Sequence, residues 1–243
     1  MINVLINGAA GRMGQEAVNA VTADSRFALV AKTGRQDDLY TAIRQSQAHV
    51  VVDLTVASAA YQNTLTIIKS GAHPVIGTSG FIAGQIATLQ TLCAEKKLGG
   101  IIVPNFSLGA VLMMKFAQQA AKYLPAVEII ERHHPAKQDA PSGTAIKTAQ
   151  MIAAVRENTQ LATPRKELLS GVRGGVCETI PIHSLRLSGS IAHQEVIFGG
   201  HQETLTIKHD SLHRACFMPG LLLACASVMQ LNELIYGLDN VLD

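Results

Sequence analysis

The chain opens with Ile2-Asn-Val-Leu-Ile-Asn7-Gly8-Ala-Ala-Gly11-Arg-Met-Gly14, an apolar run that ends in a glycine-rich turn. Apolar residues at helical spacing follow from 13 to 23. Glycine is needed where a backbone turns sharply and comes close to a pyrophosphate, and a helix that starts there points its amide donors at the phosphates. The stretch therefore predicts the first strand, turn and helix of a dinucleotide-binding domain.

Three glycines, Gly8, Gly11 and Gly14, give the turn a G-x-x-G-x-x-G spacing. The usual fingerprint is G-x-G-x-x-G, so the spacing departs from the strict pattern. A tight turn of any α/β protein is the alternative interpretation of the glycines alone. Their position directly after the first apolar run favours nucleotide binding.

Strand-like and helix-like segments alternate through the first hundred residues. Strands are predicted at 27–32, 49–54, 74–76 and 100–103, and crossover helices at 59–70 and 82–97. Strands that alternate with helices form a parallel sheet with helices on both faces. We expect an α/β chain with an N-terminal Rossmann-type dinucleotide-binding domain.

The pattern changes after residue 105. Helices are predicted at 108–123 and 144–156, and strands at 127–131, 179–187, 195–199 and 204–208. Short turns separate the last three strands, which favours an α+β domain with an open mixed or antiparallel sheet. An apolar helix at 221–234 is expected to return to the first domain. The predicted boundaries are 1–104 plus 215–243 for the dinucleotide-binding domain and 105–214 for the second.

Composition excludes several classes of protein. The 243 residues are 48% hydrophobic and 16% charged with a net charge of +2, and no long basic run calls for nucleic acid. No apolar run reaches the roughly 18 residues of a membrane span, so we expect no membrane partner. Four cysteines without CxxC spacing and a start that resembles a strand, not a signal sequence, favour the reduced cytoplasm.

The end of the second predicted strand bears on cofactor choice. NAD-binding domains usually place an acid there, whereas this chain has Lys32, Gly34 and Arg35, with Asp37 and Asp38 following. Two cations suit a 2′-phosphate, because arginine forks onto phosphate oxygens. We expect NADPH, with NADH also used. The alternative is that Lys32 and Arg35 are ordinary solvated residues.

The richest chemistry lies in Glu131-Arg-His-His-Pro-Ala-Lys-Gln-Asp-Ala-Pro-Ser-Gly-Thr-Ala145. Imidazole is the side chain that titrates nearest neutral pH, which makes a histidine of the His133-His134 pair the natural proton donor, and Lys137 either donates a proton or holds a carboxylate. Ser142, Gly143 and Thr144 stand where a turn becomes a helix N-terminus, which is a carboxylate site. This set suits reduction of an imine-like carbon in a dicarboxylate. The alternative is a surface loop.

Metal and thiol chemistry are less well supported. His209 and His213 are four residues apart, which suits a shared metal on one helix, but HExxH and a cysteine cluster are absent from the sequence. We expect no metal. Cys93 falls in a predicted helix and Cys177 in a strand-like segment, so neither is expected to act as a nucleophile.

The chain closely resembles the family of 4-hydroxy-tetrahydrodipicolinate reductases, long called dihydrodipicolinate reductases. The family signature E-x-H-H-x-x-K-x-D-A-P-S-G-T-A is present from Glu131 to Ala145. Supporting matches are Gly8 to Gly14, Asp53-Leu-Thr55, Gly77-Thr-Ser-Gly-Phe81 and Asn105-Phe-Ser-Leu-Gly109.

The resemblance implies reduction of a cyclic dicarboxylate by NADPH or NADH, with loss of water, to tetrahydrodipicolinate in lysine biosynthesis. It implies that His133 and Lys137 supply the proton, and that His134, Gly143 and Thr144 contact substrate carboxylates. It also implies a homotetramer in which the sheets of the second domain meet. The residues it implies for cofactor binding are Gly8, Ala9, Ala10, Gly11, Arg12, Met13, Gly77, Thr78, Ser79, Val103, Pro104, Asn105 and Phe106.

Three departures from the family pattern stand out. Pro135 and Ala136 replace a third basic residue of some members, which predicts lower substrate affinity. Gly34 replaces the acid of relatives that favour NADH. Where many members read G-E-H, this chain has His193-Gln-Glu195, and the sequence leaves open whether that segment reaches the active site.

Two rival functions remain at this stage. One is a dehydrogenase of the same architecture that acts on homoserine or aspartate semialdehyde. The other is a cofactor-sensing protein in which the histidine loop performs no chemistry. Activity on those substrates marks the first, and intact cofactor binding without turnover marks the second.

Overall fold

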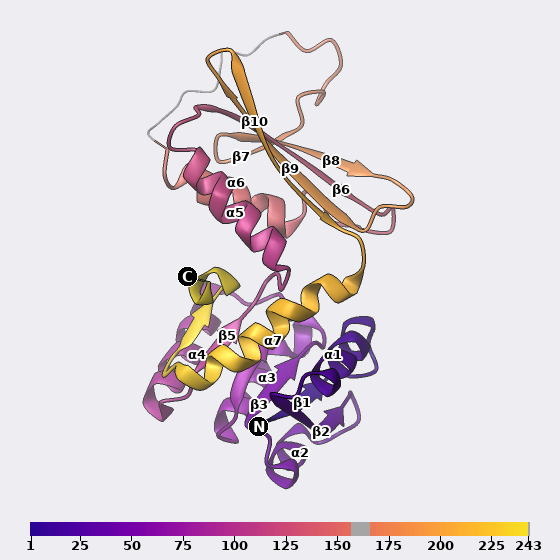
Figure 1. Ribbon diagram of the computed structural model, residues 1–243, viewed down its shortest axis with the longest axis vertical. Helices are drawn as coiled ribbons and strands as arrows, with labels where there is room; N and C mark the ends of the chain where they lie inside the picture. The colour runs from indigo at the N-terminus through magenta and orange to yellow at the C-terminus, as the bar shows by residue number, and fades with distance from the viewer. Residues whose placement is uncertain (157–165, 243) are drawn as a thin grey trace. The chain divides into compact units, whose positions relative to one another are not determined.

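Strand β1 (Ile2–Asn7) lies inside a six-stranded parallel sheet, as the opening apolar run predicts (Figure 1). The computed structural model describes residues 1–156 and 166–242. In spatial order the strands are β2 (Phe27–Thr33), β1, β3 (Val50–Asp53), β4 (His73–Ile76), β5 (Gly100–Ile102) and β11 (Leu234–Tyr236). The order reverses between β1 and β3, which is the point where doubly wound sheets bind dinucleotides.

Helices form a layer on each face of this sheet. On one side, α1 (Arg12–Ala23) contacts α7 (Met218–Ser227), and on the other α3 (Ala57–Lys69) contacts both α2 (Leu39–Ser46) and α4 (Ala83–Lys96). The valines of β3 are fully buried, as expected for a strand covered on both faces. The prediction of a Rossmann-type α/β domain is confirmed.

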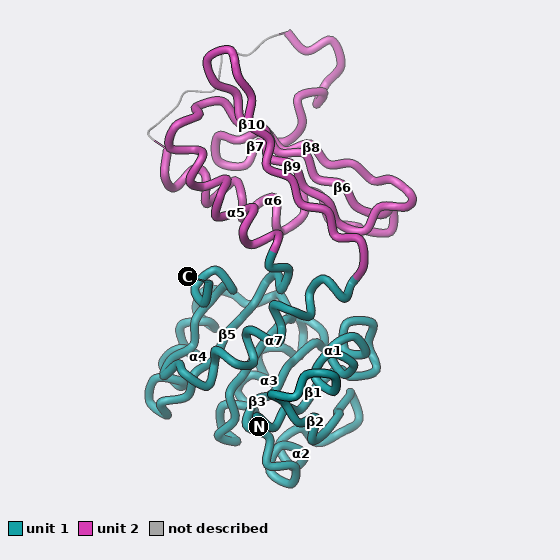
Figure 2. Tube along the Cα trace, viewed as in Figure 1, with its two compact units in different colours: residues 1–108, 214–243 teal, residues 109–213 magenta. Residues whose placement is uncertain are grey.

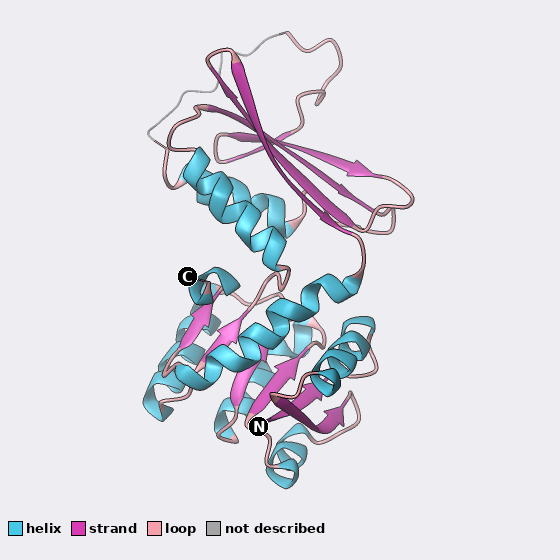
Figure 3. Cartoon of the chain, in the orientation of Figure 1, coloured by secondary structure: helices cyan, strands magenta, loops and turns pink. Residues whose placement is uncertain are grey.

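A second, five-stranded sheet follows. Its strands in spatial order are β10 (Glu203–Ser211), β9 (Ala192–Gly200), β6 (Ala126–His133), β8 (Ile180–Arg186) and β7 (Gly175–Cys177). β6 and β8 are parallel and the other pairs antiparallel, so the sheet is mixed, as predicted. Figure 3 shows α5 (Leu108–Ala120) and α6 (Gly143–Ala153) on one side of it.

Burial alternates along the strands of the second sheet. On β9, Gln194, Val196 and Phe198 are buried, whereas the residues between them are half-buried. Successive side chains of a strand point to opposite faces, so one face belongs to the core under the helices and the other is open to a partner or to water.

The chain divides into two units (Figure 2). One contains Met1–Leu108 with Arg214–Asp243, and the other Gly109–His213. Three short 3₁₀ helices lie in the C-terminal segment, at Arg214–Phe217, Val228–Gln230 and Leu238–Val241. Among the described residues, no helix is long and apolar enough to cross a bilayer.

The helix predicted at 221–234 is wrong in its second half. α7 ends at Ser227, and the chain then returns to the sheet edge, where Leu234 pairs with Gly100 in parallel register. Leu234 is almost completely buried. An apolar run suits a buried helix and a buried strand equally well, and the open edge of β5 decides in favour of a strand.

Two further helices end earlier than predicted: the one predicted to run to 123 ends at Ala120, and the one predicted to run to 156 ends at Ala153. A third helix, α2, was not predicted. Asp38 begins α2 by accepting hydrogen bonds from the backbone amides of Tyr40 at 3.0 Å and Thr41 at 3.4 Å. Asp is a favoured N-cap, and this signal was available in the sequence.

Candidate active site

His133 lies on a strand and not in a loop. β6 was predicted to end at Glu131, but it continues through Arg132 and His133, which pair with Leu185 and Arg186 of β8. Arg132 and His133 also pair with β9, on the other side of β6. Backbone pairing on both sides therefore fixes the position of His133.

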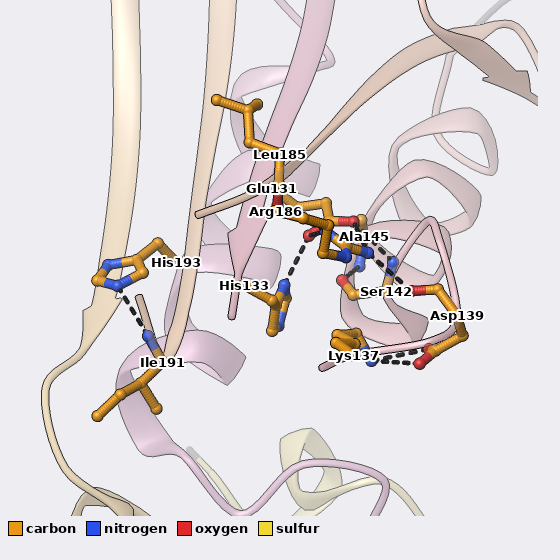
Figure 4. Close-up of polar contacts among 10 residues, drawn as sticks. All are labelled: Glu131, His133, Lys137, Asp139, Ser142, Ala145, Leu185, Arg186, Ile191 and His193. Atoms are coloured by element: carbon orange, nitrogen blue, oxygen red, sulfur yellow. Dashed lines mark hydrogen bonds and ion pairs between the residues drawn. The ribbon is translucent and has the colours of Figure 1, made fainter. Parts of the chain in front are cut away.

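A buried carboxylate lies beneath this histidine. The Glu131 side chain is fully buried and its Oε2 lies 2.6 Å from Nδ1 of His133 (Figure 4). Arg186 donates to the same carboxylate from both terminal nitrogens, at 2.9 Å and 3.0 Å. A two-point contact of this kind fixes the plane of the carboxylate as well as its position.

Arg186 and Glu131 also hold the loop that follows β6. Arg186 Nη2 donates to the backbone oxygen of Asp139 at 2.7 Å, and Lys137 Nζ donates to both carboxylate oxygens of Asp139 at 2.8 Å. The backbone amide of Ser142 donates to Glu131 Oε1 at 3.2 Å. Figure 4 shows His133 and Ser142 beside the Glu131 carboxylate, and Lys137 joined to Asp139.

The loop ends in the N-terminus of α6, as predicted. Ser142 is the N-cap and its Oγ accepts from the amide of Ala145 at 3.2 Å. A Cβ added at Gly143 would meet no atom within 4 Å, so the first turn is open on that side. Helix N-termini of this kind attract carboxylates.

A second polar contact supports α6 from below. Gln194 is buried and its Nε2 donates to Thr148 Oγ1 at 2.8 Å, while Thr148 donates to the backbone oxygen of Thr144 at 2.7 Å. The His193-Gln-Glu195 segment therefore reaches the underside of this helix through Gln194. His193 instead bonds Asp210, with 2.6 Å between Nδ1 and Oδ1.

The pKa values of His133 and Glu131 are shifted by burial and by neighbouring charges. Burial lowers the pKa of His133, the Glu131 carboxylate acts in the opposite direction, and the cations Lys137 and Arg186 add to the lowering. Burial alone would raise the pKa of Glu131, but hydrogen bonds from Arg186, Ser184 and His133 outweigh it and keep that pKa below its usual value. Glu131 is therefore ionised at neutral pH.

The glycine turn after β1 is tight, as its sequence predicts. Gly8 has φ of +86°, and a Cβ there would lie 2.8 Å from the backbone oxygen of Leu54. A Cβ at Gly14 would lie 2.1 Å from the backbone oxygen of Gly8. Glycine is required at both positions, and the resulting cradle at the start of α1 fits a pyrophosphate.

The other two predicted cofactor segments lie against each other. A Cβ at Gly77 would lie 2.6 Å from Cε2 of Phe106, which is itself buried. Asn105 shapes the turn, because its Oδ1 accepts from the amide of Ser107 at 2.8 Å. Gly77 follows β4 and Phe106 follows β5, so both segments lie at the carboxyl edge of the sheet, as Gly8 does.

A buried network around Asp53, which the sequence analysis quotes only as a family match, ties the end of β1 to α3 and to the loops after β3 and β4. The carboxylate of Asp53, at the end of β3, accepts from Asn7 at 3.0 Å, from Asn63 at 2.7 Å and from Thr78 at 3.0 Å. Thr55 adds its amide at 3.0 Å and its hydroxyl at 2.7 Å. The sequence signal for this network is an acidic residue at the end of an apolar strand.

The cations expected to bind a 2′-phosphate are exposed. Lys32 and Arg35 both face solvent at the end of β2. The strand itself ends without an acid, but Asp37 from the following turn reaches the tip, where its Oδ2 accepts from the amide of Gly34 at 2.8 Å. The tip therefore carries an acid and two cations.

The residues considered for metal binding and thiol chemistry occupy structural positions in the protein. His209 lies on β10, so it does not share a helix with His213, and the helical pairing proposed for a metal is wrong. Cys93 is buried in α4, and burial raises the pKa of its thiol to about 12. Burial, followed by the charge of Glu178, raises the pKa of Cys177. Neither thiol is activated as a nucleophile.

Fold and site together define a nicotinamide-dependent oxidoreductase of two units. The family described as dihydrodipicolinate reductase, N-terminus, matches residues 2–106, and its C-terminal counterpart matches residues 109–242. The chain belongs to the dihydrodipicolinate reductase family. This family uses NADH or NADPH, which its N-terminal Rossmann domain binds.

Individual relatives agree with this placement. The chain is 54% identical to 4-hydroxy-tetrahydrodipicolinate reductases of Legionella pneumophila, over 98% of each chain, and of Coxiella burnetii, over 99% of each. A solved dihydrodipicolinate reductase from Paenisporosarcina sp. TG-14, bound to dipicolinate, is 44% identical with a TM-score of 0.93 and full coverage of both chains. GenD2 of gentamicin A biosynthesis, at 13% identity and a TM-score of 0.68, shares only the fold.

The tight turn at Gly14 leads to a prediction. Gly14→Ala should raise the NADPH dissociation constant at least about tenfold, or about 1.4 kcal/mol, because its methyl group displaces the Gly8 carbonyl from the cradle. Titration of the protein with NADPH by calorimetry measures this. Gly84→Ala in α4 is the control, since a Cβ there meets nothing within 4 Å. An unchanged dissociation constant for Gly14→Ala contradicts the prediction.

Proposed function

We propose that this protein reduces 4-hydroxy-tetrahydrodipicolinate to tetrahydrodipicolinate in the diaminopimelate route to lysine. The observation that carries the proposal is the cluster around Glu131, which gathers His133, Lys137 and the Ser142 turn at one end of β6. The full-length likeness to enzymes of this name supports it. Overall, the substrate gains a hydride and a proton and releases water.

The roles of the residues follow from their chemistry. NAD(P)H, when bound, supplies the hydride, and the electron pair it brings creates negative charge on the substrate that a proton must neutralise. His133 and Lys137 are the groups that deliver this proton. His133 can do so from Nε2, because Nδ1 faces the Glu131 carboxylate.

The substrate carboxylates bind beside these groups. Ser142, Gly143 and Thr144 offer the N-terminal turn of α6, which is open at Gly143. His134 and Lys137 add charge or hydrogen bonds, and both are half-buried residues of the loop that leads to that turn. The solved relative that binds dipicolinate, a planar dicarboxylate, supports a ligand of this class.

Cofactor and location complete the proposal. The unit that contains β1 is the dinucleotide-binding domain and the other unit binds substrate. The pyrophosphate binds at Gly8 to Met13, and the loops Gly77 to Ser79 and Val103 to Phe106 hold the rest of the dinucleotide. All four cysteines are free thiols, which supports a cytoplasmic location.

We propose a homotetramer in which the second sheets of the subunits meet. The sheet face opposite α6 carries half-buried apolar residues in its centre, Ile130, Leu185 and Ile197. Arg132 lies on the same face, and its Nε is buried with no partner among the described residues. Light scattering should give four times the 25.8 kDa chain mass. A monomer in solution contradicts the proposal.

The function is tested by generating the substrate in place. A synthase that acts on pyruvate and aspartate semialdehyde supplies it, and wild-type protein should then oxidise NADPH only when the synthase is present. His133→Gln should lower turnover at least about 100-fold, because the proton donor is lost. His201→Gln, at an exposed turn, is the control and should change turnover less than about twofold.

The outcomes separate the rival functions. Wild-type oxidation of NADPH with aspartate semialdehyde alone, or reduction of NADP+ with homoserine, favours the related dehydrogenase. Cofactor binding without any oxidation favours the sensor. Full activity of His133→Gln excludes that residue as the proton donor and leaves Lys137.

Cofactor preference has its own test. Replacing both Lys32 and Arg35 with Ala should raise KM for NADPH at least about tenfold and leave KM for NADH within about twofold, because only NADPH carries the 2′-phosphate. The matched control replaces Arg44 and Lys69, exposed cations in the last turns of α2 and α3. Equal changes for the two cofactors contradict the assignment.

A further inference from the structure

The ion pair of buried Glu131 and half-buried Arg186 lies outside the roles assigned above to proton transfer and substrate contact. We propose that Glu131, held by Arg186, is a positioning residue that fixes the tautomer and orientation of His133 and the entry into the substrate turn at Ser142. This proposal rests on the proposed function and deepens it, since it says how the proton donor His133 and the substrate-carboxylate site at Ser142 are held together.

The hydrogen-bond inventory decides the tautomer. An ionised carboxylate only accepts, so at 2.6 Å from Glu131 Oε2 the Nδ1 of His133 must carry a proton. In neutral His133 the lone pair is then on Nε2, which is the nitrogen that takes a proton from water and passes it to the substrate. The opposite tautomer would leave Nδ1 and the carboxylate as two acceptors facing each other.

Glu131 does not adjust to a moving histidine, because it is held from several sides. Its side chain is fully buried, Arg186 contacts both oxygens, and the Ser142 amide takes Oε1. Losing a partner from such a group is costly, since a buried charge would be left with fewer donors. The carboxylate is therefore a rigid reference for His133 and for the turn at Ser142.

The same strand offers an internal comparison. Glu128 also accepts from a histidine and an arginine, His183 at 2.7 Å and Arg173. Glu128 and Glu131 are three residues apart on β6, so they point to opposite faces of the sheet. Glu128 is more than a third exposed and has no contact with the histidine loop among the described residues. It is the matched control for Glu131 once light scattering shows that the variant keeps the wild-type mass, because Glu128 lies on the sheet face proposed for the subunit contact.

The charges facing His133 give the direction of a pH effect. They are Glu131 on β6, Arg186 on β8, and Lys137, itself paired with Asp139, in the loop. On the β9 side, Ala192 pairs opposite His133 and adds no charge. Of these groups only Glu131 contributes a raising effect on the pKa of His133. Removing its charge therefore lowers that pKa, and activity that needs protonated His133 is lost at lower pH.

The experiment compares Glu131→Gln with Glu128→Gln in the synthase-coupled assay across pH. Glu131→Gln should lower kcat at least about tenfold, as removal of an orienting carboxylate does elsewhere. The alkaline limb of its pH profile should move to lower pH, and the NADPH dissociation constant should stay within about twofold. Glu128→Gln should keep the wild-type limb. A lower kcat with an unmoved limb, or an equal shift in Glu128→Gln, overturns the proposal.

A second measurement needs no variant and no turnover. Long-range proton–nitrogen NMR of the wild-type protein, with nitrogen-15 in its histidines, reports which ring nitrogen of His133 is protonated in the neutral form. We expect Nδ1, and protonation at Nε2 overturns the proposal even if Glu131→Gln does not fold. Absence of NADPH oxidation by the wild type, with the Nδ1 tautomer present, would reject the function and leave this positioning intact.

Discussion

A carboxylate that is buried must be surrounded by hydrogen-bond donors, and in this protein that constraint shapes both units. Asp53 ends β3 in the first sheet and Glu131 stands near the end of β6 in the second, and both are fully buried. Neither has bulk water as a partner. Each therefore draws loop amides, hydroxyls or cations from several parts of the chain to one point.

In the first unit the donors to Asp53 are neutral. Asn7, Asn63, Thr55 and Thr78 converge on it, and they come from β1, α3 and the loops after β3 and β4. The end of β1 and the loops after β3 and β4, which lie at the nucleotide edge of the sheet, are thus tied to the Asp53 carboxylate. The glycines at the surface of that edge then leave the cofactor access to the backbone.

In the second unit the donors to Glu131 include two ionisable groups. Arg186 neutralises the carboxylate, and His133 faces it. Burial and the cations Lys137 and Arg186 lower the pKa of His133, whereas the Glu131 anion raises it. Arginine suits this position better than lysine, because its planar fork meets both carboxylate oxygens at once. The balance keeps Glu131 ionised and leaves the pKa of His133 below its usual value, because burial and the two cations outweigh the carboxylate.

Much of this was available from the amino-acid sequence. The glycine turn, the alternation of strands and helices, the change of pattern after residue 105 and the His133 to Thr144 segment are all local in the chain. Local signals suffice where a turn needs φ above zero, as at Gly8, or where a helix needs an N-cap, as at Ser142. The unpredicted α2 also has such a signal in its N-cap Asp38.

The tertiary structure decided what depends on distant partners. Leu234 belongs to a strand because β5 offers a free edge, Asp37 reaches Gly34 through a turn, and Arg186 meets Glu131 across 55 positions of sequence. Apolar pattern and residue type do not contain this information, because it depends on which strands become neighbours. The order of strands β9, β6 and β8 is what turns a histidine motif in the sequence into a histidine with a fixed carboxylate partner.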